Sequence, residues 1–179
     1  MNDLIRVTEV LKPFIDSYVE EGSLAQELYF KRGIFVHEWC ANYAKKIWKP
    51  IELDDYRGYV ECFRYWFDKY VQEVIFIEQR FDDRAWGFTG QPDLACVLRG
   101  EITGTLIDYK TSAVTQKWWM GQLGAYYHLA QQFPFPIEKA GALQLFDDGR
   151  KAQFVVCDDP KEAFAAFLSA LNAYRYFKR

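Results

Sequence analysis

Two short apolar segments with a turn between them constrain the fold of this chain more than any other feature. Residues 94–98 and 105–107 are apolar and bounded by turn residues, which is typical of two neighbouring β-strands. If the turn centres on Gly100 and Glu101, residues that face each other have numbers that sum to 201. Provided that no bulge or slip intervenes, Asp93 then faces Asp108.

Lys110 lies two residues beyond Asp108, so its side chain projects from the same face of the expected strand. Two adjacent carboxylates repel each other, and a Mg²⁺ or Mn²⁺ ion between them removes this repulsion. Such an ion also activates water and neutralises phosphate charge, and a neighbouring lysine can orient the water. The hairpin therefore predicts a site able to hydrolyse a phosphodiester bond.

The Asp-x-Lys triplet at residues 108–110 is weak evidence by itself. Asp159, Pro160 and Lys161 form the same triplet, yet they precede an expected helix and no strand surrounds them. The hairpin partner Asp93 distinguishes the first triplet from the second.

The composition indicates one domain, residues 1–179, with N-terminal helices over about 1–70 and a sheet core over about 71–179. Half of the residues are hydrophobic and 18% are aromatic, enough for a sizeable core. The net charge of −3 argues against a general nucleic-acid coat protein but allows an enzyme that contacts a few phosphates.

The cysteines and the apolar runs indicate a cytoplasmic protein, in the host cytoplasm if the chain is viral. Cys40, Cys62, Cys96 and Cys157 are scattered and never form Cys-x-x-Cys, which argues against a zinc or iron–sulfur site and fits a reducing compartment. No apolar run reaches the ~18 residues of a membrane span, and the N-terminus shows no signal-peptide pattern. We therefore expect no membrane partner.

The periodicity of the chain changes from helical to alternating and back. Helices are expected over 4–18 (bent at Pro13), 33–48, 54–70, 116–132 and 160–177, and strands over 71–81, 94–98, 105–107, 140–146 and 152–156. Asp54 or Asp55 and Asp158 or Asp159 are the expected caps of two helices. This order predicts an α/β (α+β) fold with a central mixed sheet of about five strands flanked by helices.

Two further residues are candidates for the metal site. His37 shares a helical stripe with apolar residues and points inward, either as a hydrogen-bonded core histidine or as a metal or phosphate ligand. Glu78 follows an apolar strand, on the predicted face of Val74 and Phe76. It is either an additional metal ligand or the wet end of the strand.

Substrate contacts are expected from the helix after the hairpin and from nearby cations. Gln122 and Tyr126 are four residues apart and share a helix face, where they can bind a phosphate oxygen or steady Lys110. Trp118 and Trp119 cannot both face the core, and the exposed one either stacks on a base or packs under a loop. Arg32 and Lys117 are either phosphate contacts or solvated surface charges.

Five blocks, in order, resemble the PD-(D/E)XK nuclease superfamily and its RecB-like and phage-type exonuclease branch. They are Arg32-Gly33-x-x-x-His37, Glu78, Gly90-x-Pro92-Asp93, Ile107-Asp108-Tyr109-Lys110-Thr111-Ser112 and Gln122-Leu123-x-x-Tyr126. They span more than half of the chain. The expected order of elements also resembles the restriction-endonuclease-like core of that family.

The resemblance implies roles for these residues. Asp93, Asp108 and the backbone carbonyl of Tyr109 would bind Mg²⁺ or Mn²⁺, with His37 as an extra ligand, and Lys110 would assist the attacking water. Gln122 and Tyr126 would line the site. Some relatives carry four cysteines for an iron–sulfur cluster, and the scattered cysteines here depart from that pattern.

The leading functional hypothesis is a Mg²⁺- or Mn²⁺-dependent exodeoxyribonuclease that acts on linear single- or double-stranded DNA ends in recombination, repair or phage replication. The alternatives are an endonuclease of the same fold and an inactive nucleic-acid-binding or assembly protein. Inactive relatives usually lack an acidic ligand or the lysine, and all three are present here. A second copy of the chain and a recombination protein are the candidate protein partners.

Overall fold

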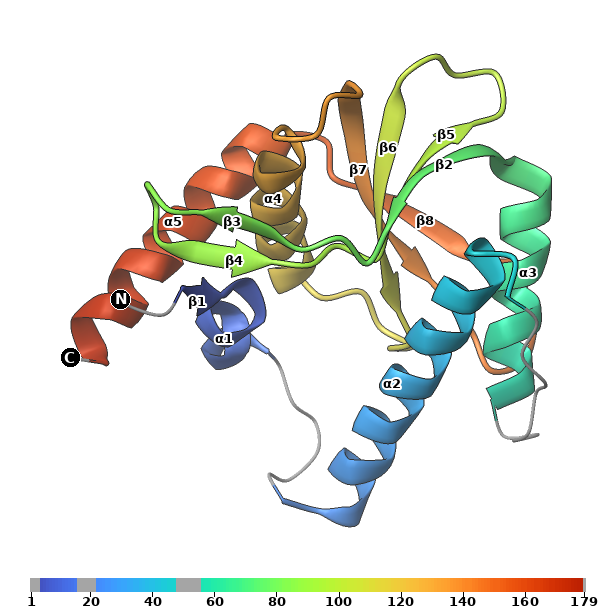
Figure 1. Ribbon diagram of the computed structural model, residues 1–179. Coiled ribbons are helices and arrows are strands. Elements are labelled where there is room, and N and C mark those ends of the chain that lie inside the picture. Colours follow the sequence, from blue (N-terminus) through green and yellow to red (C-terminus); the bar gives the residue numbers. More distant parts are fainter. Residues whose placement is uncertain (1–3, 16–21, 48–55, 179) are drawn as a thin grey trace.

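The computed structural model describes residues 4–15, 22–47 and 56–178 (Figure 1). Its helices are α1 (Val7–Leu11), the 3-10 turn η1 (Lys12–Phe14), α2 (Leu24–Ala44), α3 (Arg57–Tyr70), α4 (Trp118–Ala130) and α5 (Pro160–Phe177). Its strands are β1 (Ile5–Arg6), β2 (Val71–Ile77), β3 (Phe81–Asp83), β4 (Phe88–Gly90), β5 (Leu94–Leu98), β6 (Gly104–Lys110), β7 (Ile137–Gln144) and β8 (Gln153–Val156).

The main sheet has five strands in the order β2-β5-β6-β7-β8. Only β6 and β7 pair in parallel, and the three other pairs are antiparallel. Parallel neighbours need a crossover connection, and α4 supplies it between β6 and β7. The predicted mixed five-stranded sheet flanked by helices is confirmed.

The β5–β6 hairpin has the predicted register. Leu94 pairs with Ile107 and Val97 with Gly104, so the paired numbers sum to 201 throughout the ladder. Gly100 has a positive φ of 85°, which a glycine adopts at little cost in the connecting turn. No bulge interrupts this ladder, and its continuation by one residue brings Asp93 beside Asp108.

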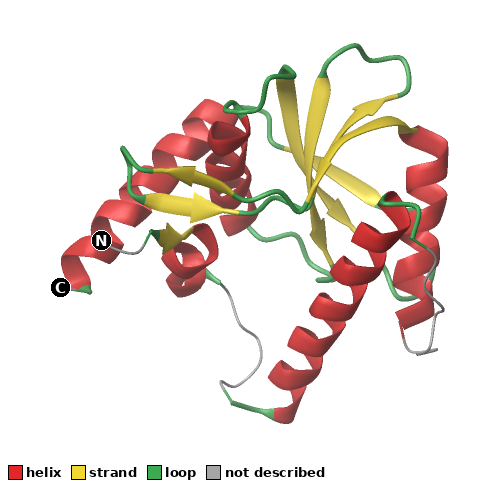
Figure 2. Cartoon of the chain, viewed as in Figure 1, coloured by secondary structure: helices red, strands yellow, loops and turns green. Residues whose placement is uncertain are grey.

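Helices cover both faces of the main sheet, as predicted (Figure 2). On one face, α1, α4 and α5 pack against alternate sheet residues such as Ala95 and Leu106. On the other face, α2 and α3 pack against Leu94, Ile107 and Tyr109. Because both faces are buried, the central strands read as continuous apolar runs.

A second, three-stranded sheet with the order β1-β4-β3 was not predicted. Its strands have two or three residues, too few for a period to show. The helix expected over 4–18 is therefore wrong in part: residues 5–6 form β1, the helix covers only 7–11, and Pro13 lies in η1. In Figure 1, this small sheet lies beside α1, α4 and α5.

The boundaries of α2 differ from the expectation. The helix begins at Leu24, where Ser23 caps it by accepting a hydrogen bond from the Gln26 backbone, rather than at Gly33. A glycine inside a helix costs only about 1 kcal/mol, so Gly33 does not end it. The predicted end at Trp48 and the predicted cap at Asp54 or Asp55 lie outside the described residues.

The alternation predicted for residues 71–81 is wrong, because two register shifts interrupt β2. Val74 and Ile77 pack on the α2–α3 side, whereas Ile75 and Phe76 pack on the α4 side. The strand also ends at Ile77, so Glu78 lies just beyond it. Extra residues of this kind bend a strand and change which side chains share a face.

The last helix agrees with its prediction. α5 covers Pro160–Phe177, with Pro160 in its first turn. Of the two predicted caps, Asp159 accepts hydrogen bonds from the backbone of Lys161 and Glu162. Within the described residues, no helix is long and apolar enough to span a membrane.

Candidate active site

The candidate site lies at the carboxyl end of β6. Along this strand, Ile107 and Tyr109 point into the core on the α2–α3 side. Strand alternation turns Asp108 and Lys110 toward the opposite face, which α4 covers. Both polar side chains are buried, and buried charges need partners.

Asp93, just before β5, is held by two contacts. Its Oδ1 lies 3.1 Å from His37 Nδ1, and its Oδ2 accepts a hydrogen bond of 2.6 Å from the Tyr109 backbone amide. The second contact crosses from the start of β5 to β6, as the register requires. These two contacts fix the Asp93 carboxylate between β6 and α2, at the open end of the β5–β6 hairpin.

Lys110 is held by Asp108 and by α4. Its Nζ lies 2.5 Å from Asp108 Oδ2 and donates a hydrogen bond of 2.6 Å to Gln122 Oε1. The ammonium also lies 4.6 Å from the centroid of the Trp118 ring, within the range of a cation–π contact.

Gln122 connects the β6 residues to the rest of α4. Its Nε2 lies 3.4 Å from Asp108 Oδ1 and donates to the Tyr126 hydroxyl at 3.1 Å. Of the predicted i, i+4 pair, Gln122 therefore contacts both Asp108 and Lys110, and Tyr126 contacts Gln122. This arrangement fixes the lysine by one amide oxygen and leaves its charge facing Asp108.

The Asp108 carboxylate is buried and has two partners. Its Oδ2 forms an ion pair with the Lys110 ammonium, and its Oδ1 lies near the Gln122 amide. Burial raises the pKa of Asp108, Lys110 opposes this shift, and Asp93 adds to it. A carboxylate in such surroundings gains from an additional cation.

The donor set fits a hard divalent cation only in part. Among residues 4–15, 22–47 and 56–178, no three His, Cys, Asp or Glu side chains converge into a ready-made metal site. Mg²⁺, however, usually keeps several waters and takes only one or two carboxylates from a protein. Asp93 and Asp108 meet that smaller requirement.

His37 lies at the edge of this group. Its ring contacts Asp93 and lies edge-on to Tyr109, and 32% of its side chain is exposed. Burial disfavours the protonated ring, but the Asp93 carboxylate outweighs this effect and raises the pKa of His37. The ring is thus hydrogen-bonded to Asp93 at the edge of the site, and Ala41 and Ala44 of the same helical stripe are buried.

The Glu78 side chain forms an ion pair with a lysine. Its carboxylate is 3.2 Å from Nζ of Lys45, the residue that follows α2, and its φ is +48°. Only its backbone reaches the site, where the Glu78 amide donates to the Asp93 carbonyl at 2.9 Å. Glu78 thus positions the Asp93 backbone in this structure.

The predicted substrate residues are placed differently from one another. Arg32 donates to Thr111 Oγ1 at 3.3 Å, just beyond Lys110. Trp119 is buried, whereas Trp118 is half-buried beside Lys110. Lys117 is exposed at the start of α4.

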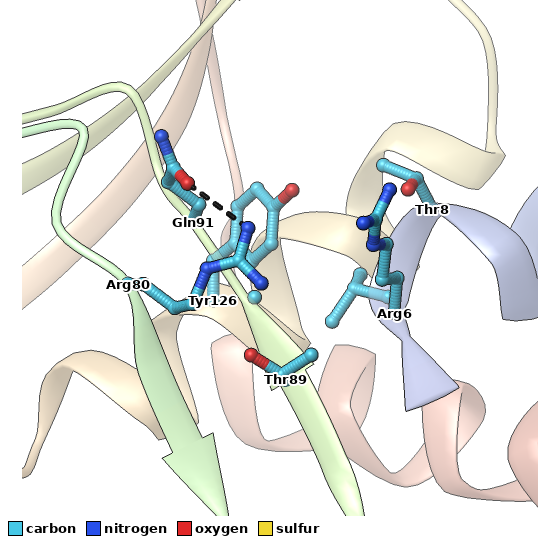
Figure 3. Close-up of a pocket in the computed structure, with 8 residues that line it drawn as sticks. Arg6, Thr8, Arg80, Thr89, Gln91 and Tyr126 are labelled. Atoms are coloured by element: carbon cyan, nitrogen blue, oxygen red, sulfur yellow. Dashed lines mark hydrogen bonds between the residues drawn. The ribbon is translucent and has the colours of Figure 1, made fainter. Parts of the chain in front are cut away.

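A pocket beside the site was missed by sequence reasoning (Figure 3). It has a volume of about 200 Å³ and shares Tyr126 with the site; its lining also includes Arg6, Thr8, Arg80, Thr89 and Gln91. The sequence did offer a signal for Arg80, because it lies only two residues after Glu78, a residue already predicted to lie near the site. Arg6 gave none, because it reaches the pocket only through the unpredicted β1–β4 pairing.

Gly90 brings the small sheet against α4 at this pocket. A Cβ atom on Gly90 would lie 2.8 Å from Tyr126 and from Leu129, closer than side chains pack. The first residue of the Gly90-x-Pro92-Asp93 block therefore permits the approach of the chain to α4, which places Tyr126 between the pocket and Gln122.

Comparisons with known proteins show a shared fold and no sequence family. No protein-family model and no curated protein matches the chain. A solved structure from Eubacterium rectale, named "putative exonuclease", superposes with a TM-score of 0.54 at 12% identity over 96% of this chain and 82% of its own. The structure of SSO0001 matches with a TM-score of 0.40 at 14% identity, over 97% of this chain and 85% of its own. The first likeness shows a shared fold of nuclease-like type.

Proposed function

We propose that this protein is a Mg²⁺- or Mn²⁺-dependent deoxyribonuclease. The observation that carries the proposal is the buried group at the end of β6, where Asp108 pairs with Lys110 and Gln122 holds the lysine. Asp93, also buried, is hydrogen-bonded to the backbone of the intervening residue Tyr109. The fold shared with the Eubacterium rectale protein supports the nuclease class.

In this mechanism Asp93 and Asp108 would hold the cation, with His37 as a further ligand and the Tyr109 carbonyl as the backbone ligand. When bound, the cation would supply an activated water and neutralise charge on the scissile phosphate. Lys110 would orient the attacking water and stabilise the negative charge that develops on the phosphate. Gln122 keeps the Lys110 ammonium in place, which matters because small displacements of a positioned group cost much of its effect.

The finer proposal is an exonuclease that acts on linear DNA ends, single- or double-stranded, in recombination, repair or phage replication. Its support is the likeness to a protein named for exonuclease activity and the resemblance of the five sequence blocks. DNA is the proposed partner, with a second copy of the chain or a recombination protein as candidate protein partners.

The test is digestion of end-labelled linear DNA and covalently closed circular DNA with Mg²⁺, with Mn²⁺ or with EDTA. Wild type is compared with Asp108→Asn and Lys110→Gln. Asp159→Asn and Lys161→Gln are the matched controls, because they make the same two changes in the other Asp-x-Lys triplet. Thermal melting of every variant separates lost activity from lost folding.

We expect metal-dependent cleavage of linear DNA, abolished by EDTA and by the two site variants and retained in the controls. Cleavage of the circle as fast as of the linear DNA would replace the exonuclease by an endonuclease. Absence of metal-dependent cleavage of every substrate would refute the enzyme and leave a nucleic-acid-binding protein.

A further inference from the structure

The pocket beside the candidate site carries positive charge and no acidic lining. Arg6 enters it from β1 and Arg80 from the segment before β3, as Figure 3 shows. The remaining polar lining consists of hydroxyl and amide groups: Thr8, Thr89, Gln91 and Tyr126. A volume of about 200 Å³ holds a phosphate group with several waters, since each water takes about 30 Å³ in the liquid.

Neither arginine is neutralised within the part of the chain that the structure describes. Arg80 Nη2 donates to the neutral amide oxygen of Gln91 at 3.4 Å, and no ion pair involves Arg80 or Arg6. Asp82, which accepts the Thr89 hydroxyl at 2.7 Å, does not line the pocket. Guanidinium groups without a carboxylate partner are available to an anion, and their planar forks match a phosphate group.

The pocket is coupled to the candidate site through one side chain. Tyr126 forms part of its wall, and the Tyr126 hydroxyl accepts the hydrogen bond from Gln122 Nε2. Gln122 in turn contacts Asp108 and Lys110. The pocket and Asp108 are thus linked by two neighbouring side chains of α4, Tyr126 and Gln122.

We propose that Arg6 and Arg80 form a second phosphate subsite, which binds a phosphate group of the nucleic-acid strand next to the one at Asp93 and Asp108. This inference rests on the proposed function. In it, the two arginines align the nucleic-acid strand on the candidate active site. The ligand chemistry is a phosphate ester, supplied either by an internal linkage or by a terminal phosphate.

The test measures binding without catalysis. Affinity for a short fluorescent single-stranded DNA is measured by anisotropy in EDTA, for wild type, Arg6→Gln, Arg80→Gln and the double variant. Arg64→Gln is the matched control, because Arg64 is an exposed arginine on α3, which packs on the other face of the main sheet. Melting curves establish that each variant is folded.

In the same assay, the phosphates of the DNA are neutralised one at a time with methylphosphonate linkages. Separate oligonucleotides carry a 5′-phosphate, a 5′-hydroxyl or a 3′-phosphate. Each arginine change is expected to weaken binding about tenfold, because a hydrogen bond to a charged group is lost. It is also expected to lower the slope of log affinity against log salt by about 0.7 per lost phosphate contact.

The proposal predicts that neutralising one particular phosphate weakens wild-type binding as much as the double arginine change does, and that it has no further effect in the double variant. If that phosphate is terminal, the pocket receives a strand end; if it is internal, the pocket receives the backbone. Equal affinities of wild type and the double variant, or an undiminished effect of every neutralised phosphate in the double variant, would overturn the subsite.

The outcome is separable from that of the proposed function. Cleavage that persists while the arginine variants bind like wild type refutes only the subsite. Phosphate-dependent binding through the arginines without cleavage by wild type refutes only the nuclease.

Discussion

The chain contains the same Asp-x-Lys spacing twice, and the two copies lie in opposite environments. Asp108 and Lys110 are buried on a central strand, 2.5 Å apart, and Gln122 of α4 holds the lysine. Asp159 and Lys161 are exposed at the start of α5, where the Asp159 carboxylate accepts hydrogen bonds from the helix backbone.

The difference shows that the surroundings decide what a triplet does. On a strand, residues i and i+2 point to the same face, so the two charges meet. At a helix N-terminus the acid satisfies free backbone amides, and the lysine two residues later belongs to the first turn. The first pair carries a charge arrangement suited to catalysis, and the second starts a helix.

The largest expected difference between the pairs is in activity after removal of the acid. Asp108→Asn should lower the cleavage rate at least about a hundredfold. This loss is at the upper end of what replacing a residue that only orients a metal ligand usually causes. Asp159→Asn should leave the rate within about twofold, because an asparagine caps a helix nearly as well as an aspartate. Single-turnover cleavage of linear DNA measures both, and equal losses would remove the distinction.

The lysines should differ next. Lys110→Gln is expected to slow cleavage about a hundredfold, as does removal of a single preorganised donor in other enzymes. Lys161→Gln should change neither the rate nor the free energy of unfolding beyond about 0.5 kcal/mol. If Lys110→Gln retains the wild-type rate at saturating metal, the lysine is structural.

Acidification should weaken metal binding at a higher pH than an ordinary aspartate would. Only the ionised carboxylate binds a cation, and burial raises the pKa of Asp108 above its usual value of about 3.9. The folded protein thus holds this proton more tightly than the unfolded chain. Without metal, ionisation of Asp108 therefore costs stability as the pH rises through this window, and a bound cation offsets the cost.

The corresponding measurement is a Mn²⁺ titration at a series of pH values, followed by calorimetry. Below the raised pKa, affinity should fall by about tenfold per pH unit for each proton displaced. His37 contributes in the same direction, because its pKa is also raised and its ring must be neutral to bind a metal. In His37→Gln, the part of the pH dependence of Mn²⁺ affinity that arises from the histidine, at the higher pH values, should disappear. Constant affinity down to pH 4 would contradict the assignment of Asp108.

The smallest expected effect is on stability, and here the exposed Asp159 rather than the buried Asp108 is the residue that matters. Asp159→Ala should lower the free energy of unfolding by about 1 kcal/mol through loss of the α5 cap, with activity unchanged. Asp158→Ala is the control, because Asp158 is exposed and is not the cap. Urea denaturation measures both, and equal stabilities of the two variants would show that the cap contributes nothing.

Much of the fold was predictable because it depends on patterns close together in the chain. The register of the hairpin followed from the positions of Gly100 and the two apolar runs, and the span of α5 followed from Asp159 and its periodicity. The bulges of β2 were not predictable, because cross-strand packing rather than local preference decides them.

The candidate site divides in the same way. Its central group of Asp93, Asp108 and Lys110 could be assembled from one hairpin, since strand periodicity dictates which residues share a face. The ion pair between Glu78 and Lys45 could not be predicted. It depends on the left-handed backbone of Glu78 and on a lysine distant in the sequence.

The sequence by itself therefore determined that Asp93, just before β5, comes beside Asp108 of β6 and that Lys110 shares a face with Asp108, because a two-residue period and one turn relate them. Only the tertiary structure decided that Gln122 holds that lysine, that His37 contacts Asp93, and that Arg6 and Arg80 share a pocket with Tyr126. These contacts join segments that no local period relates. Burial of apolar surface between the helices and the sheet brings them together, because it depends on the packing of the whole chain.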